Sequence, residues 1–248
     1  MERNNLKIKH LTKDYKVNGT KLNVLDAIDL QVLDREFFTI VGPSGCGKTT
    51  LIRIIAGLEK PSSGKVFLND QIIRSPSKKI GYIPQEFSLF PWKTVEGNIN
   101  FGLKVNNVKK SVSKVKVNQL LNLTGLFKFK DYYPKEISGG MQQKVAIARS
   151  LATNQNILLL DEPLRSIDAQ SRNKLQDDII EIWKKSNRTM FFVTHNIDEA
   201  VYLSDRIAVL SPLPGSVKEI IPVSLDRPRD RTSSEFNAIR KKILNLIF

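Results

Sequence analysis

A glycine-rich loop near the start of the chain has residue types suited to binding phosphate. It is made of Gly42, Pro43, Ser44, Gly45, Cys46, Gly47, Lys48 and Thr49. The pattern G-x-x-x-x-G-K-[ST] follows the apolar run 37–41, as expected for a loop between a strand and a helix. Its glycines let consecutive backbone N–H groups turn toward phosphate oxygens, and Lys48 adds positive charge for the β- and γ-phosphates. The Thr49 hydroxyl suits Mg²⁺, and a helix beginning at Thr49 and Thr50 would present its positive end to the anion.

The single cysteine of the chain, Cys46, lies inside this loop. One cysteine excludes an internal disulfide and fits a reducing compartment. Because no histidine lies nearby in the sequence to activate the thiol, we interpret Cys46 as a small spacer and not as a nucleophile.

Two acidic residues, Asp161 and Glu162, follow the aliphatic run 157–160. A carboxylate at the end of a buried strand, facing a phosphate loop on a neighbouring strand, is what the positioning of Mg²⁺ requires. We therefore expect Asp161 to hold the ion, through water, and Glu162 to act as the general base that polarises the attacking water. The alternative for the same pattern is an acidic residue that only ends a strand.

His195 and Gln85 each close a further predicted strand. His195 follows the run 191–194 and, at a strand end, could donate a hydrogen bond to the γ-phosphate. The amide of Gln85 could ligate a metal or water and report on the γ-phosphate. A packed or surface histidine and a turn glutamine without a role are the alternatives, and His10, which has no such context, is interpreted as structural.

A second candidate anion site lies at Ser138, Gly139 and Gly140, within the segment 137–143. Ser138 is a favourable N-cap, and the two glycines expose backbone N–H groups at the start of a helix. One γ-phosphate does not need two such helix ends. The sequence therefore predicts that each end serves a different nucleotide across a dimer interface.

The order of the predicted elements indicates how these residues could be brought together. Short β segments are expected over 6–40 with Asn18-Gly19 as a hairpin turn, and strands at 64–68, 80–83, 157–160, 190–193 and 206–210. Helices are expected at 49–56, 141–152 and 169–185, with helix-period patterns over 86–155. From Pro212 onward we expect a less regular tail that ends in a helix over 235–246. This order predicts an α/β nucleotide-binding core interrupted by a helical insertion.

Composition limits the class of protein. The 248 residues are 41% apolar and 26% charged, which suits one sizeable globular domain. The first residues lack the apolar centre of a secretory signal, and the longest apolar run falls far below the roughly 20 residues of a membrane span. We therefore expect a protein that is neither exported nor membrane-spanning.

The net charge of +14 is concentrated between Lys104 and Lys130, a segment with seven lysines and no acidic residue. Apolar residues interleave with the lysines at Val112, Val115, Leu120, Leu121 and Leu123. This pattern indicates an amphipathic helix with its lysines outward. A solvated face is the favoured interpretation, and contact with an anionic membrane leaflet is the alternative.

Taken together, these motifs resemble the ATP-binding subunit of ABC transporters over nearly the full chain. The family's phosphate loop is similar to Gly42–Thr49, its Q-loop to Gln85 and its signature to Ile137–Met141. Its Walker B pair is similar to Asp161-Glu162, its D-loop to Ser166–Asp168 and its switch histidine to His195. Tyr15 lies where the family has an aromatic residue that stacks on adenine, with a core tyrosine as the alternative.

The resemblance implies an α/β fold: a P-loop NTPase (RecA-like) core with an N-terminal antiparallel β subdomain and an inserted α-helical subdomain. Residues 1–85 and 156–215 would form the core, 86–155 the helical subdomain and 216–248 a C-terminal tail. It also implies a homodimer that holds ATP and Mg²⁺ between the phosphate loop of one subunit and the signature of the other. Asp168 would join the nucleotide site, and Thr49, Gln85 and Asp161 the metal site.

The departures from the family pattern leave every catalytic group in place. Ile137 and Met141 replace the commonest Leu and Gln of the signature, Pro84 precedes Gln85 where an aromatic residue is frequent, and Ile167 replaces the usual D-loop leucine. Arg165 falls where a smaller residue is common and could alter the contact between two subunits.

Within the family, the segment 90–95 and the tail 227–236 resemble importers of nitrate, sulfonate, taurine and related small organic solutes. The implied activity is ATP hydrolysis coupled to solute import at the cytoplasmic face of the cell membrane. A transmembrane permease would dock near Phe87–Trp92, and a solute-binding protein would act indirectly. One alternative is a non-transport ATPase of the same superfamily that acts on nucleic acid or ribosomes, which the single domain and the short insertion disfavour. The other is a P-loop kinase that phosphorylates a small molecule.

Overall fold

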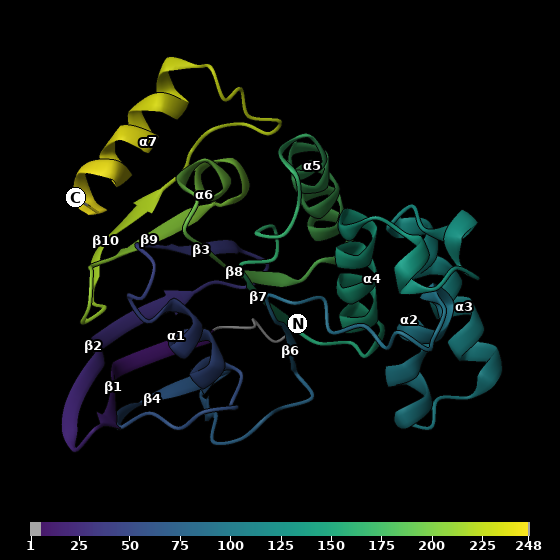
Figure 1. Cartoon of the computed structure of the whole chain (residues 1–248), viewed down its shortest axis with the longest axis horizontal. Helices are drawn as coiled ribbons and strands as arrows, with labels where there is room; N and C mark the ends of the chain where they lie inside the picture. The colour runs from purple at the N-terminus through teal and green to yellow at the C-terminus, as the bar shows by residue number, and fades with distance from the viewer. Residues whose placement is uncertain (1–5, 248) are drawn as a thin grey trace.

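The chain forms two β-sheets and a set of helices that cover them (Figure 1). The structure is a computed structural model that describes residues 6–247. Its strands are β1 (Leu6–Val17), β2 (Thr20–Val32), β3 (Phe37–Val41), β4 (Ser63–Leu68), β5 (Gln71–Ile72), β6 (Ile80–Ile83), β7 (Ile157–Asp161), β8 (Thr189–Thr194), β9 (Arg206–Leu210) and β10 (Val217–Pro222). Its helices are α1 (Lys48–Ile55), α2 (Val95–Val105), α3 (Lys110–Leu123), α4 (Gly139–Ala152), α5 (Ala169–Ser186), α6 (Ile197–Leu203) and α7 (Ser234–Ile247), with short 3₁₀ turns at Phe127–Phe129 and Pro134–Glu136.

A six-stranded sheet in the order β10-β9-β3-β8-β7-β6 carries the predicted site residues. Its strands from β9 to β6 pair in parallel. The carboxyl ends of parallel strands lie at one edge of a sheet, so the loops after β3, β6, β7 and β8 meet there. The loop after β3 is the phosphate loop, and the loops after β6, β7 and β8 contain Gln85, Glu162 and His195, respectively.

Both faces of this sheet are buried, which explains the nearly unbroken apolar runs of β3, β7 and β8. Successive side chains of a strand point to opposite faces. Phe37 accordingly packs in a core with the C-terminal and inserted helices, and Phe38 packs in a second core with α1 and the N-terminal sheet. The edge of the sheet is therefore fixed from both sides.

The N-terminal strands form a separate antiparallel sheet in the order β2-β1-β4-β5. The turn at Asn18-Gly19 joins β1 and β2, as predicted, although these strands are long and the sequence indicated short segments. The predicted α/β core with an antiparallel N-terminal sheet and inserted helices is confirmed. The exact division into 1–85 with 156–215, 86–155 and 216–248 stays a prediction.

Helix α3 confirms the helical part of the lysine-rich segment but corrects its predicted apolar face. Leu120 and Leu121 are buried, whereas Val112 and Val115 are 54% and 59% exposed. The buried stripe begins instead at Ser113 and continues through Val117. Ser113 can lie on the buried face of α3 because its hydroxyl hydrogen-bonds to the Asn100 side chain of α2. A buried polar group is tolerated when it has such a partner.

The C-terminal tail is more regular than the sequence indicated, because residues 217–222 form the edge strand β10 against β9. The terminal helix α7 is confirmed. Between them, buried Arg229 donates hydrogen bonds to the carbonyl oxygens of Val201 (2.6 Å) and Val223 (3.2 Å). Burial lowers the pKa of Arg229 to about 10. Within residues 6–247, none of the helices combines the length and apolar character needed to cross a bilayer.

Candidate active site

The phosphate loop connects β3 to α1 at the carboxyl edge of the parallel sheet. Gly45 and Gly47 have φ of 82° and 96°, in the left-handed region that side chains rarely occupy. A Cβ atom on Gly47 would also lie 2.7 Å from Leu25 Cδ2. These two glycines are therefore needed for the shape of the loop, as the motif predicts.

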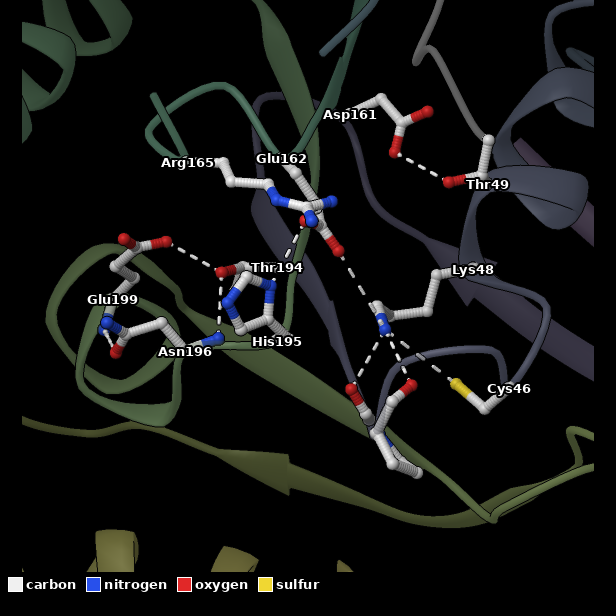
Figure 2. A network of polar contacts seen from close by, with 12 residues as sticks. Cys46, Lys48, Thr49, Asp161, Glu162, Arg165, Thr194, His195, Asn196 and Glu199 are labelled. Atoms are coloured by element: carbon white, nitrogen blue, oxygen red, sulfur yellow. Dashed lines mark hydrogen bonds and ion pairs between the residues drawn. The ribbon is translucent and has the colours of Figure 1, made fainter. Parts of the chain in front are cut away.

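Lys48 is the first residue of α1 and its side chain is only 4% exposed. Its Nζ donates hydrogen bonds to the carbonyl oxygens of Gly42 (2.9 Å) and Pro43 (2.8 Å). The same nitrogen lies 4.0 Å from Glu162 Oε1 (Figure 2). A buried ammonium group is thus held over the loop, where it can meet a phosphate. Cys46 is also buried, and burial raises the pKa of its thiol, which fits a spacer and not a nucleophile.

Asp161 ends β7 directly opposite the start of α1. Thr49 Oγ1 lies 3.3 Å from Asp161 Oδ1, and the Tyr82 hydroxyl of β6 donates to Asp161 Oδ2 at 3.2 Å. Burial raises the pKa of the Asp161 carboxyl, and burial together with Asp161 raises the pKa of Tyr82 to about 12. The hydroxyl of Thr49 and the carboxyl of Asp161 are a pair of hard oxygen donors that fits Mg²⁺.

Glu162 has an unusual backbone that aims its side chain at the phosphate loop. Its φ is 44°, a left-handed conformation that is costly for a non-glycine residue and is often found at functional sites. The backbone N–H of Glu162 donates to Val193 O at 2.9 Å, so the neighbouring strand β8 fixes the turn. The carboxylate is 12% exposed and lies 3.1 Å from His195 Nδ1 (Figure 2).

His195 follows β8 and is held in place by residues that the sequence reasoning missed. The Thr194 hydroxyl donates to Glu199 Oε2 at 2.6 Å and accepts from the Asn196 backbone N–H at 3.0 Å. Asn196 in turn caps α6 by accepting from the Glu199 backbone N–H at 3.2 Å. Burial raises the pKa of Glu199. The sequence Asn196-Ile-Asp-Glu199 is a helix-start pattern that could have identified this support.

Gln85 and Arg165 complete the pocket. They line a cavity of about 250 Å³ together with Glu162, Val24 and the loop residues Ser44, Gly45, Gly47, Lys48, Thr49 and Thr50. With its amide oxygen turned toward Arg165, Gln85 accepts hydrogen bonds from Nη1 (2.9 Å) and Nε (3.3 Å) of the guanidinium group. The sequence reasoning did not place Arg165 in this pocket, since only the turn after β7 brings it there.

The structure thus brings together the phosphate loop, Gln85, Asp161, Glu162 and His195. The residues that line this pocket include none of the signature. Ser138 caps α4 by accepting from the Met141 backbone N–H at 3.3 Å, and with Gly140 it lines a different cavity beside α5. Gly139, the first residue of α4, is also outside the phosphate pocket.

Tyr15 and Asp168 also lie outside the phosphate pocket. The Tyr15 hydroxyl donates to Glu59, and Lys13 Nζ lies 4.8 Å from the centre of its ring. Asp168 caps α5, because its Oδ1 accepts from the Ser171 backbone N–H at 2.9 Å, and this contact lowers its pKa. Adenine stacking by Tyr15 and nucleotide contact by Asp168 stay predictions.

An aromatic segment, Phe87–Trp92, follows Gln85 on the surface. Phe90 packs against Phe101 with ring centroids 4.5 Å apart, while Trp92 is 69% exposed. Buried Asn98 of α2 holds the loop 90–94 through its side-chain amide. Its Oδ1 accepts a hydrogen bond from Phe90 N (2.9 Å). Its Nδ2 donates to the carbonyl oxygens of Phe90 (3.2 Å), Lys93 (3.0 Å) and Thr94 (3.0 Å). The exposed tryptophan is therefore presented on a fixed loop.

Replacing Asn98 with alanine should lower the free energy of unfolding by about 2–3 kcal/mol, because several buried backbone groups would lose their partner. Urea denaturation followed by circular dichroism measures this loss. Asn122→Ala, at an exposed position of α3, serves as the control. A loss below about 0.5 kcal/mol for Asn98→Ala, the usual range for a surface substitution, would contradict the assigned role.

Comparisons with known proteins identify the family of this chain. Residues 25–165 match the model of a family described as ABC transporter. An uncharacterized ABC transporter ATP-binding protein of Methanocaldococcus jannaschii is 50% identical, over 98% of this chain and 91% of its own length. The aliphatic sulfonates import ATP-binding protein SsuB of Bacillus subtilis is 45% identical, over 94% of this chain and 90% of its own.

Solved structures show the same arrangement of elements. A dimeric, post-hydrolysis ATP-binding cassette bound to ADP and Pi has a TM-score of 0.76 and 29% identity, covering 89% of this chain and all of its own (100%). The protein cbiO1 of Clostridium perfringens, described as part of the ABC transporter complex cbiONQ, has a TM-score of 0.79 and 26% identity, covering 88% of each chain.

Proposed function

Because the chain belongs to the ABC transporter family of ATP-binding proteins, we propose that it powers the import of a small organic solute. The chain is an ABC-type ATPase that binds and hydrolyses ATP. Several relatives are named as aliphatic sulfonate import proteins, so an aliphatic sulfonate is the first solute to test. Nitrate, taurine and related compounds follow. The comparisons give no support to action on nucleic acid or ribosomes.

The proposed chemistry is hydrolysis by an activated water molecule. The single observation that carries it is the meeting of Lys48, Glu162 and His195 around one pocket, with Glu162 3.1 Å from His195 and 4.0 Å from Lys48. Glu162 would accept the proton of the attacking water, and Lys48 and His195 would stabilise the charge that develops on the terminal phosphate.

Thr49 and Asp161, with Gln85, would hold Mg²⁺ at the same pocket. Their oxygen atoms are the ligand types that this ion prefers, and Thr49 Oγ1 and Asp161 Oδ1 are already 3.3 Å apart. When bound, the ion neutralises phosphate charge. The raised pKa of Asp161 follows from burying a carboxylate, a cost that a bound cation would offset.

We also propose that the working form is a homodimer with two composite nucleotide sites. Ser138 and Gly140 line a cavity separate from the phosphate pocket of the same chain. A second subunit could place Ser138, Gly139 and Gly140 over that pocket, where the capped helix end suits an anion. The dimeric cassette bound to ADP and Pi supports this arrangement as a similar protein.

The partner that couples hydrolysis to import would be a transmembrane permease, docked at Phe87–Trp92. Trp92 is the exposed large apolar side chain of this segment, and an exposed tryptophan on a fixed loop is typical of a protein interface. Docking there would hold the subunit peripherally at the cytoplasmic face of the membrane. A solute-binding protein would act on the permease and not on this chain.

Trp92→Ala should weaken assembly with the permease about tenfold or more, as expected for loss of a central aromatic contact, and leave ATP affinity unchanged. Co-purification of the permease in detergent and equilibrium ATP binding measure the two effects. Leu213→Ala, which removes a 47% exposed apolar side chain elsewhere, is the matched control. Unchanged assembly in Trp92→Ala would rule out this docking site.

Uptake of a radiolabelled aliphatic sulfonate by cells that lack this protein tests the solute. Loss of uptake, restored by the wild-type chain but not by Glu162→Gln, is the expected result. Normal uptake in the deletion strain would direct the same assay to nitrate and taurine.

A further inference from the structure

Arg165 is a charged residue that lines the phosphate pocket, on the turn between β7 and α5. Its Nη1 lies 3.6 Å from Glu162 Oε2, and with the Gln85 amide oxygen turned toward it, its guanidinium donates to that oxygen at 2.9 and 3.3 Å. The two partners belong to segments far apart in the sequence, and Arg165 bridges them. Figure 2 shows the guanidinium next to the Glu162 carboxylate.

The oxygen atoms of Glu162 are contacted by three groups that carry or can carry positive charge. Oε2 is shared between His195 Nδ1 at 3.1 Å and Arg165 Nη1 at 3.6 Å, and Oε1 lies 4.0 Å from Lys48 Nζ. A water molecule that gives its proton to Glu162 has to approach one of these two oxygen atoms. Movement of one of the three partners would open an approach to the carboxylate on that side.

Of the three partners, Arg165 is the one suited to be exchanged. Lys48 is buried and hydrogen-bonded to the phosphate loop, and His195, whose side chain is 45% exposed, makes the shortest of the three contacts with Glu162. The Arg165 side chain is 57% exposed. A long, exposed side chain held by an ion pair of small net strength can leave with little cost.

The second partner of Arg165 gives this exchange a physical trigger. One residue, Glu86, separates Gln85 from the partly exposed segment Phe87–Trp92, so a partner that binds this segment and shifts it could shift Gln85 as well. The planar guanidinium fork contacts Gln85 and Glu162 at the same time, which a lysine ammonium group at this position would not reproduce. Motion of Gln85 would then change the position of Arg165 relative to Glu162.

We propose that Arg165 is a positioning residue that ties Glu162 to Gln85, and that release of this tie frees Glu162 to act as a base. The inference rests on the proposed role of Glu162. It links the surface segment Phe87–Trp92 to the catalytic carboxylate through one side chain. It also gives a role to Arg165, which directly precedes the D-loop at a position where the family commonly has a smaller residue.

Steady-state ATP hydrolysis by the isolated full-length chain tests the tie. Arg165→Ser should raise kcat about threefold to fivefold, the factor expected for the loss of one half-exposed ion pair, with KM for ATP changed less than twofold. Arg165→Lys, which keeps the charge but lacks the fork, should fall between Arg165→Ser and wild type. Arg240→Ser, which removes a half-exposed arginine paired with Asp198 at 2.8 Å, is the matched control and should leave kcat unchanged.

A second measurement separates this inference from the function on which it rests. In a Glu162→Gln background, Arg165→Ser should leave the residual rate unchanged, because the tie acts only through Glu162. If Glu162→Gln lowers turnover as proposed but Arg165→Ser lowers kcat or leaves it unchanged, the tie is wrong and the base is retained. If Glu162→Gln keeps normal turnover, the base and the tie are both wrong.

Discussion

Glu162→Gln should bind ATP as tightly as the wild type and hydrolyse it about 10²-fold or more slowly, the usual scale for losing a general base. The amide keeps the size of the carboxylate but cannot accept a proton from water. Its position should be preserved, because the Glu162 backbone is fixed by the hydrogen bond to Val193 O at 2.9 Å. Since hydrolysis would reopen the dimer, the closed dimer should accumulate when ATP is added.

Two measurements check this prediction: phosphate release under steady-state conditions and the fraction of dimer seen by size-exclusion chromatography with ATP. Glu181→Gln is a matched control, because Glu181 is an exposed acid paired with Lys185 at 3.1 Å on the far part of α5. It should match the wild type in both assays. Near-normal turnover in Glu162→Gln would show that another group activates the water.

The sequence predicts the site best where chemistry is carried by a local pattern. The phosphate loop needs glycines at positions with left-handed φ, and Gly45 and Gly47 have 82° and 96° there. The position of Asp161 was predictable because a fully buried strand has an unbroken apolar run, and the first polar residue marks its end. His195 follows the apolar run 190–193 of β8 after one further residue, Thr194. Ser138 was predictable as an N-cap for the same local reason.

The features that the sequence did not predict depend on contacts between distant segments. Tyr82 reaches Asp161 only because β6 pairs with β7, and no local pattern specifies this pairing. Ser113 can be buried because its hydroxyl hydrogen-bonds to the side chain of Asn100 in α2. A hydrophobicity pattern would place a serine on the outer face of the helix. Strand β10 forms on the edge offered by β9, so its residues appear irregular when read alone.

Arg165 illustrates the same limit within the site itself. In the sequence, Arg165 is only a residue of a turn where the family commonly has a smaller side chain. The course of this turn depends on the left-handed backbone of Glu162, which has a φ of 44°. Only the folded turn places it 3.6 Å from Glu162 Oε2. The candidate catalytic groups can thus be proposed from motifs, whereas the side chains that contact and orient them are found only in the tertiary structure.

Two inactive variants of this chain should recover activity when they are mixed, if each nucleotide site is shared between subunits. Lys48→Ala removes the buried cation of the phosphate loop, and Ser138→Arg places a bulky side chain at the exposed tip of α4. Each homodimer should lose about 10²-fold or more in turnover. Ser138→Arg also removes the N-cap hydrogen bond from the Met141 backbone N–H, so the folding of this variant has to be checked.

The mixed dimer contains one intact site, made from the phosphate loop of the Ser138→Arg subunit and the signature of the Lys48→Ala subunit. Random pairing of equal amounts makes half of the dimers mixed, so the expected activity per subunit is about a quarter of wild type if the sites act independently. Thermal unfolding of each variant confirms that both are folded before mixing. If turnover of the mixture stays at the level of the separate variants, each nucleotide site is formed by one subunit alone. Full activity of Ser138→Arg by itself would show that the signature is not part of the site.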